Sequence, residues 1–180
     1  YVYYTDPGGA SSWIGAVSRS GGILQVVSTT KTDTFSASVA ARPTISGAVT
    51  GLSTSITPSS SANKILVTGT VVVAAATQGV VHVHLFRDGV VSTFKANTAG
   101  NRQVSASGRF VQTGAADATN VYGFTFLDSA GSTATTTYDI RLSHDGTGAT
   151  NVYVNRSVTD TDASNFGRGV SALTLMEVAG

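Results

Sequence analysis

The stretch Val80-Val-His-Val-His-Leu-Phe-Arg-Asp-Gly-Val-Val91 decides the fold class of this chain. Its side chains alternate between two faces with the period of two that a β-strand requires. One face carries aliphatic residues and the other a mixed set: Val81, Val83 and Leu85, then His82, His84 and Phe86. Asp88-Gly89 follows as a two-residue turn that tolerates positive φ. The stretch therefore predicts a β-hairpin that joins Val80–Arg87 to Val90–Phe94.

Similar strand-like segments recur along the chain, and none shows the apolar spacing of an amphipathic helix. The other expected strands are Ile23–Thr30, Thr32–Ser38, Val49–Thr57, Lys64–Ala76, Arg109–Thr113, Val121–Leu127, Thr137–His144, Thr150–Asn155 and Gly169–Val178. Lys64–Ala76 is nearly continuous in β-branched residues, which predicts a strand buried on both faces or inside an interface. Strands joined by tight turns predict an all-β fold, an antiparallel, jelly-roll-like β-sandwich.

Alternation also predicts which side chains of Thr137–His144 face the core. We expect three to be buried and three to lie outside: Tyr138, Ile140 and Leu142, then Asp139, Arg141 and Ser143. The polar segment Lys95–Ser107 is expected to form a long loop.

The first twenty residues differ from the rest, because a tyrosine-rich start runs into a Pro-Gly-Gly turn before Trp13. We expect residues 1–20 to be a short N-terminal arm or the end of an upstream module, and residues 21–180 to form the sandwich domain. The chain begins without Met or a basic leader, which indicates a processed end or a piece of a longer protein. The aromatic residues of the arm are expected to pack either on a neighbouring subunit or on their own domain.

Composition narrows the classes of partner. Only 12% of the 180 residues are charged and the net charge is +1, so no field favours nucleic acid or a membrane surface, and we expect neither partner. The chain has no Cys, which removes disulfides, thiolate catalysis and Cys-ligated zinc. Its longest apolar run, Val71–Ala76, is far shorter than the roughly 20 residues that span a bilayer.

The histidines are the first candidates for chemistry. His82 and His84 lie on one face of a strand about 7 Å apart, a spacing that suits one metal ion if further ligands arrive from elsewhere, as at a threefold axis. The alternative is that both lie on the solvent or interface face of an ordinary strand. Since no carboxylate or third histidine is near in sequence, the alternative is favoured and no metal site is expected.

Two other motifs have a catalytic or metal-binding interpretation beside a structural one. His144-Asp145-Gly146 could serve a serine nucleophile, but no Gly-x-Ser-x-Gly motif is present, and a turn after a strand is favoured. Asp160-Thr-Asp162 could contribute to a calcium site but has too few spaced oxygen ligands, so a loop turn is favoured. Glu177 is the only glutamate, so no carboxylate pair for glycoside hydrolysis is evident. We predict no catalytic residue, no cofactor and no enzyme; a hydrolase on a sandwich scaffold is the third hypothesis.

Four segments resemble, in their order and spacing, a family of virion structural proteins of tailed phages. Such sequences are frequent among cyanophages and other aquatic phages. The four segments are Gly21–Ser36, Gly51–Val67, Val152–Arg156 and Arg168–Glu177. The resemblance implies a β-sandwich on the outside of a phage particle, decorating the capsid or forming part of a fibre, and usually self-associated around a threefold axis. The resemblance implies no catalytic residue in this chain.

The leading expectation is a capsid cement or decoration protein on the outer surface of the virion. It would self-associate as a homotrimer and bind the major capsid protein, or fibre and tail proteins, and so stabilise the shell. Lys64–Ala76 and His82–Phe86 are the candidate self-association surface, and Tyr1–Trp13 is the candidate arm that grips the capsid.

The alternative is a tail-fibre or receptor-binding module that recognises host surface glycan through its loops. The candidate loops are Lys95–Arg102 and Arg156–Arg168. Their hydrogen-bonding candidates are Arg102, Asn155, Arg156 and Asn165. Glycan sites usually include an exposed aromatic side chain, and only Phe94 and Phe166 are near these loops.

Overall fold

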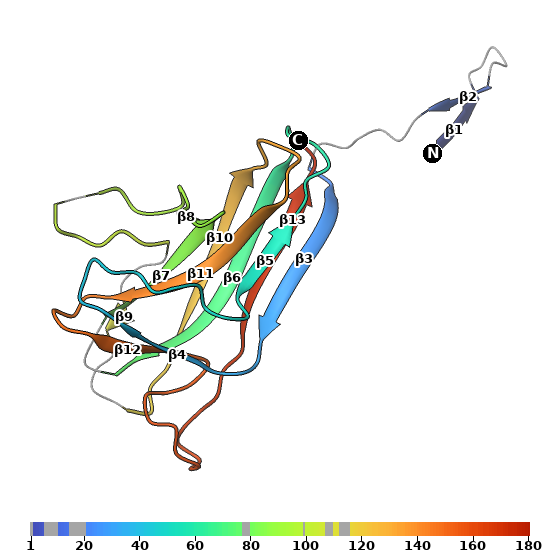
Figure 1. Cartoon of the computed structure of the whole chain (residues 1–180). Helices are drawn as coiled ribbons and strands as arrows, with labels where there is room; N and C mark the ends of the chain where they lie inside the picture. The colour runs from blue at the N-terminus through green and yellow to red at the C-terminus, as the bar shows by residue number, and fades with distance from the viewer. Residues whose placement is uncertain are drawn as a thin grey trace.

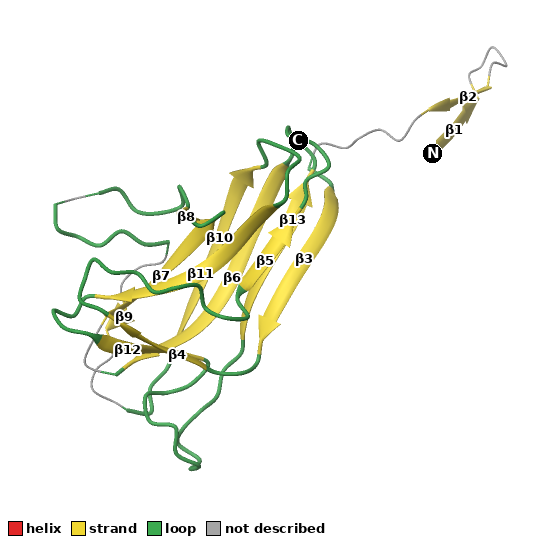
Figure 2. Cartoon of the chain, in the orientation of Figure 1, coloured by secondary structure: helices red, strands yellow, loops and turns green. Residues whose placement is uncertain are grey.

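The computed structural model describes residues 2–5, 11–14, 21–76, 80–98, 100–106, 110–111 and 116–180. In these residues all regular secondary structure is β-strand, and two antiparallel sheets pack face to face (Figures 1 and 2). Every segment predicted to be a strand contains one. The predicted all-β, antiparallel sandwich is therefore confirmed, and its jelly-roll character stays a prediction. No helix long and apolar enough to cross a membrane occurs in the residues described.

The first sheet has six strands and is organised around β6 (Lys64–Ala75). One side of β6 pairs along its length with β10 (Asn120–Ser129). The other side of β6 pairs with two shorter strands, β13 (Ser171–Val178) near the start of β6 and β12 (Thr150–Val154) near its end. Beyond these lie β3 (Ile23–Lys31), which pairs with β13, and β4 (Phe35–Val39), which pairs with β12.

The second sheet contains the sequence stretch that predicted the fold. Its order is β5 (Ser53–Ile56), β11 (Thr136–His144), β7 (Val80–Arg87) and β8 (Val90–Val91), and β9 (Phe110–Val111) also pairs with β7. The predicted hairpin turn is confirmed, since Asp88 and Gly89 have φ angles of 51° and 78°. The Asp88 carboxylate also accepts a 2.8 Å hydrogen bond from the backbone N–H of Thr137, which ties the turn to β11.

The arm region contains one further pair of strands. β1 (Val2–Thr5) and β2 (Ser11–Ile14) form an antiparallel hairpin in which Val2 lies opposite Ile14. Tyr1, residues 6–10 and residues 15–20 of the predicted arm lie outside the described residues, as do the side chains of both strands. The division at residue 20 and the capsid contact of this arm stay predictions.

The core lies between the two sheets and is built from alternate residues of their strands. On β11, Tyr138, Ile140 and Leu142 are fully buried, as predicted. The expectation that Asp139 and Ser143 lie outside is wrong, because both are buried too. Their face of the second sheet is covered by side chains and loops of the same chain. The Arg141 guanidinium, for example, lies 3.9 Å from the centre of the Phe86 ring and bonds to the Asp139 carboxylate at 2.7 Å.

Strand β6 changes character along its length. Its end, from Val71 to Ala75, is buried on both faces, as its β-branched composition predicts. Its first half alternates, so that Ile65 and Val67 face the core while the residues between them are less buried. Most of Lys64–Ala76 and all of His82–Phe86 are thus covered within one chain. Their assignment as a self-association surface is wrong for the buried residues.

Glu177 closes the end of the core with a set of hydrogen bonds that the sequence did not indicate. Its Oε1 atom accepts bonds from the Ser59 N–H at 2.7 Å, from the Ser59 hydroxyl at 2.7 Å and from the Asn63 amide at 2.6 Å. Burial by itself raises the pKa of the Glu177 carboxyl, but the donors from Asn63 and Ser59 outweigh it, so the pKa is lowered from its ordinary value of 4.5.

We expect Glu177→Gln to lower the free energy of unfolding at pH 7 by about 1–2 kcal/mol, because neutral hydrogen bonds replace charge-assisted ones. A carboxylate whose pKa is depressed on folding stabilises the protein above its unfolded pKa, and this contribution is lost as the pH falls through the folded pKa. The difference between wild type and variant in urea unfolding should therefore shrink between pH 7 and pH 3. Asp162→Asn, at an exposed loop position, is the control and should change little at either pH. An equal Glu177→Gln difference at both pH values would contradict this account.

Candidate functional site

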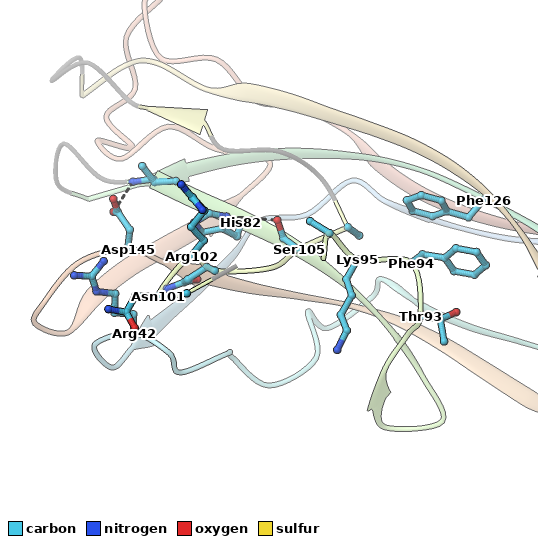
Figure 3. Close-up of a pocket in the computed structure, with 15 residues that line it drawn as sticks. Arg42, His82, Thr93, Phe94, Lys95, Asn101, Arg102, Ser105, Phe126 and Asp145 are labelled. Atoms are coloured by element: carbon cyan, nitrogen blue, oxygen red, sulfur yellow. Dashed lines mark hydrogen bonds between the residues drawn. The ribbon is translucent and has the colours of Figure 1, made fainter. Parts of the chain in front are cut away.

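A pocket of about 1240 Å³ opens beside β7, where the long loop 92–106 leaves and returns to the sheet (Figure 3). The loop is anchored at both ends to the β7 backbone: the Ser92 N–H bonds to the Leu85 carbonyl at 3.0 Å, and the Ala106 N–H bonds to the Val83 carbonyl at 3.0 Å. The predicted polar loop is confirmed over the residues described. It forms one wall of the pocket, and β7 and β10 supply residues to the others.

The same loop covers the histidine face of β7. Gln103 donates to the His144 carbonyl at 2.8 Å and accepts a 2.8 Å hydrogen bond from the Ser143 hydroxyl. The Ser143 oxygen is in turn 2.8 Å from Nε2 of His84, which is only 3% exposed. The expectation that His82 and His84 lie on a solvent or interface face is therefore wrong, because the loop after β8 folds back over them and bonds to the end of β11.

These contacts argue against a catalytic role for the histidine pair. Burial, together with His82, lowers the pKa of His84 to about 4, so the ring is neutral at pH 7. Since the Ser143 hydroxyl hydrogen goes to Gln103, its oxygen accepts from His84 and is not activated by it. No group of three or more His, Cys, Asp or Glu side chains that could hold a metal ion occurs in the residues described.

His144 and Asp145 have separate structural roles. Both ring nitrogens of His144 bond to backbone: Nε2 to the Val39 carbonyl at 2.8 Å, and Nδ1 to the Gly146 N–H at 2.9 Å. The Asp145 carboxylate accepts a 3.1 Å bond from the Val80 N–H and lines the pocket. The structural interpretation of this motif holds, because the histidine holds the chain in place after β11.

Three cationic side chains line the pocket: Arg42, Lys95 and Arg102. The other cations in the described residues have partners: Lys31, Arg87, Arg141, Arg156 and Arg168 each pair with an aspartate, and Lys64 bonds to Ser129. Arg42, Lys95 and Arg102 have exposed side chains and form no ion pair within the part of the chain that the structure describes. Asp145 is the one carboxylate among the lining residues, so the pocket is positively charged.

Aromatic side chains also line the pocket, away from Arg42 and Asn101 in Figure 3. Phe94 from the loop stacks on Phe126 from β10, with ring centroids 4.8 Å apart and planes 11° from parallel. Phe124 stacks behind Phe126 at 5.7 Å. Sequence reasoning identified Phe94 and Arg102 as parts of a binding loop, but it missed Phe126 and Arg42. These two lie on distant segments, and no local sequence signal places them beside the loop.

The second predicted glycan loop, Arg156–Arg168, does not contribute to this pocket. Asn155 is fully buried, and its amide donates to the backbone carbonyls of Lys31 and Asp33 at 2.7 and 3.0 Å. Asn155 and Arg156 were predicted to contact glycan, but their side chains hold the fold together instead. The Arg156 guanidinium bonds to carbonyls of its own loop. Asn165 is exposed elsewhere, and of the four predicted residues only Arg102 lines the pocket.

Asp160 also has a structural role. Its carboxylate pairs with Arg168 at 2.7 Å and with Arg156 at 3.5 Å, so it links the two ends of the loop. This pairing supports the loop-turn interpretation of Asp160-Thr-Asp162 over a calcium site.

Comparison with known proteins adds no family to this description. No protein-family model matches the chain. No curated protein matches it either. Fold and site together define an all-β sandwich that carries a cationic, partly aromatic pocket.

Proposed function

We propose that this chain is an accessory structural protein of a phage particle, a capsid cement or decoration protein on the outer surface of the virion. It self-associates as a homotrimer and binds the major capsid protein, or fibre and tail proteins. The phage setting and the threefold order come from the resemblance of the sequence. The observation that supports self-association is the chemistry of the outer face of the first sheet.

Three rows of residues that lie directly opposite one another on four strands make up the middle of that outer face. The first row is apolar and the second carries hydroxyl groups: Val26, Met176, Leu66 and Leu127, then Ser28, Thr174, Thr68 and Thr125. The third row is Thr30, Ala172, Thr70 and Gly123. None of these twelve residues is charged, and Val26 and Leu127 at the two sides are 57% and 56% exposed. We call these three rows the neutral face.

A second copy of the chain is the partner that the neutral face fits best. Burying a charged partner here would remove that charge from water without offering a counter-charge, which is costly. Around a threefold axis the neutral faces of three copies converge, so each meets the same apolar row and the same hydroxyl groups on its neighbours, and contact buries apolar area without that penalty. Fully burying a Val or Leu side chain is worth about 1.5–3 kcal/mol, and exposed apolar patches commonly mark interfaces.

The mass of the protein in solution tests this proposal. We expect sedimentation equilibrium to give a trimer for wild type and a monomer for Val26→Asp/Leu127→Asp, because the charges would be buried unpaired at the contact. Val90→Asp is the matched control, since Val90 is also an exposed apolar residue, 70% exposed, but lies on β8 of the second sheet. Circular dichroism checks that each variant is folded. A monomeric wild type, or an aspartate variant that stays trimeric, contradicts the proposal.

The location on the particle needs a separate experiment. Cryo-microscopy of particles assembled with and without this chain should show added density on the capsid surface. Density at the tail tip alone would exclude the capsid role and favour the fibre alternative.

A second candidate function is recognition of host surface glycan by a fibre or receptor-binding module. The pocket favours it, since pockets that bind small molecules combine apolar surface with a few placed polar groups. Here the stacked Phe94 and Phe126 supply the apolar surface, and Asn101 and Gln103 add amide groups. Phe126, which lies outside the two predicted loops, supplies a second aromatic side chain beside Phe94.

A further inference from the structure

We infer that the pocket beside β7 binds an acidic saccharide, a sugar chain bearing carboxylate groups such as uronic acid residues. This inference rests on the second candidate function and adds to it the chemical class of the ligand. Three features of the pocket carry it: unpaired positive charge, an aromatic surface and the size of the space.

The positive charge is the most specific of the three. The fold pairs the other cations of the described residues with a carboxylate or a hydroxyl, yet it gathers Arg42, Lys95 and Arg102 around one space without an ion-pair partner there. Like charges that line one space repel, and an anion that enters relieves the repulsion. Arginine suits an oxyanion such as a carboxylate, because its planar group donates two parallel hydrogen bonds to two oxygens of the anion.

The three cationic side chains come from two separate segments that the fold brings together at the pocket. Arg42 comes from the segment after β4, whereas Lys95 and Arg102 come from the loop after β8. The backbone N–H of Arg42 bonds to the Gly146 carbonyl, which holds the first segment beside the residues that follow β11. Asp145, from that same region, is held by the Val80 N–H and offers an acceptor for a sugar hydroxyl.

The remaining lining residues suit a sugar ring better than a small inorganic anion. The rings of Phe94 and Phe126 offer an apolar surface on which the C–H groups of a pyranose can pack. The volume of about 1240 Å³ exceeds the space that one small anion needs and lies above the usual range for drug-sized ligands, roughly 300–1,000 Å³. An oligosaccharide that carries both carboxylates and C–H faces uses all of these groups at once.

The first test compares acidic glycans with neutral forms of the same backbone. The full chain is applied to an array of bacterial surface polysaccharides, and its affinity for oligogalacturonate is measured by calorimetry against the same oligomer with its carboxylates reduced to alcohols. We expect binding of acidic glycans, and at least a tenfold loss of affinity when the carboxylates are reduced.

Substitutions then test the assignment to this pocket. Arg42→Ala/Arg102→Ala should weaken acidic glycan binding by roughly 10- to 100-fold while the circular dichroism spectrum stays unchanged. Arg168→Ala is the control, because it also removes an exposed arginine, but from outside the pocket. Phe94→Ala should weaken the binding of acidic and of neutral oligomers alike, since the aromatic surface contacts C–H groups that both oligomers share.

The outcomes distinguish recognition of acidic saccharide from recognition of glycan in general. Equal binding of the acidic and reduced oligomers would overturn the inference and leave glycan recognition standing. Unchanged binding by a folded Arg42→Ala/Arg102→Ala variant would also overturn it. Failure to bind any glycan on the array would overturn both the inference and the second candidate function.

Discussion

Gly69→Ala should lower the free energy of unfolding by about 3 kcal/mol, because the core has no room for one more methyl group at this position. Gly69 on β6 lies opposite Phe124 on β10, and the Phe124 ring covers the glycine. A Cβ atom added at residue 69 would overlap Cζ of that ring and lie only 2.7 Å from Cε1. The ring is buried and stacks on Phe126 at 5.7 Å, so it cannot move aside without disturbing the pocket wall.

Urea unfolding at one protein concentration measures this effect. Gly123→Ala is the matched control, because Gly123 lies on β10 and pairs with Thr70, the residue after Gly69, but no atom lies within 4 Å of a Cβ added there. It should change stability by no more than about 1 kcal/mol. In Gly69→Ala/Phe124→Leu, the smaller side chain should recover part of the loss relative to the sum of the single changes. Additive single changes would show that the ring is not the cause.

Arg87→Ala should have the second large effect, a loss of about 2–4 kcal/mol, since it leaves a partly buried carboxylate without its cation. The guanidinium of Arg87 on β7 bonds to the Asp128 carboxylate at 2.8 Å and to the carbonyls of Ser129 and Ala130 at 2.9 Å each. Asp128 also accepts a 2.7 Å bond from the Tyr138 hydroxyl. Because β7 and β10 belong to different sheets, this cluster joins the two layers of the sandwich.

The hydroxyl of Tyr138 remains a donor throughout the ordinary pH range. Burial, then the bond to Asp128, raises its pKa far above the usual value for tyrosine. The Tyr138 bond therefore survives in the Arg87→Ala variant, and the expected loss comes from Arg87 alone.

Thermal and urea unfolding of two further variants test the account of Arg87. Arg87→Lys keeps the charge but cannot make the same three bonds, so its stability should fall between wild type and Arg87→Ala. Arg168→Ala removes a pair whose arginine side chain is 58% exposed, and we expect a loss of no more than about 1 kcal/mol. Equal losses for Arg87→Ala and Arg168→Ala would show that the link between the sheets adds nothing beyond a surface ion pair.

The sequence predicts those parts of the fold that depend on neighbours along the chain. Alternation alone identified the core-facing residues of β11, such as Tyr138 and Ile140, and the Asp88-Gly89 dipeptide identified the hairpin. Both signals are local, because side-chain direction in a strand and the φ angles of a turn follow from adjacent residues.

What the sequence does not predict is how distant segments meet. The path of loop 92–106 depends on bonds such as Gln103 to Ser143, which join residues 40 positions apart, so the burial of the histidines could not be predicted. Likewise, the pocket combines Arg42 with Phe126, and nothing in either local sequence refers to the other. The neutral face follows from strand register, which requires knowing that Met176 lies between Val26 and Leu66.

The absence of charge from the neutral face, and the cations of the pocket, predict opposite responses of the two proposed activities to dissolved salt. The screening length of an electrolyte falls from about 10 Å at 0.1 M to about 3 Å at 1 M, and this weakens only contacts between charges. The proposed contacts through the neutral face have no such term, so we expect subunits joined there to stay together at high salt. We expect a carboxylate bound by Arg42 and Arg102 to be released under the same conditions, so that ionic strength would separate the two proposed activities.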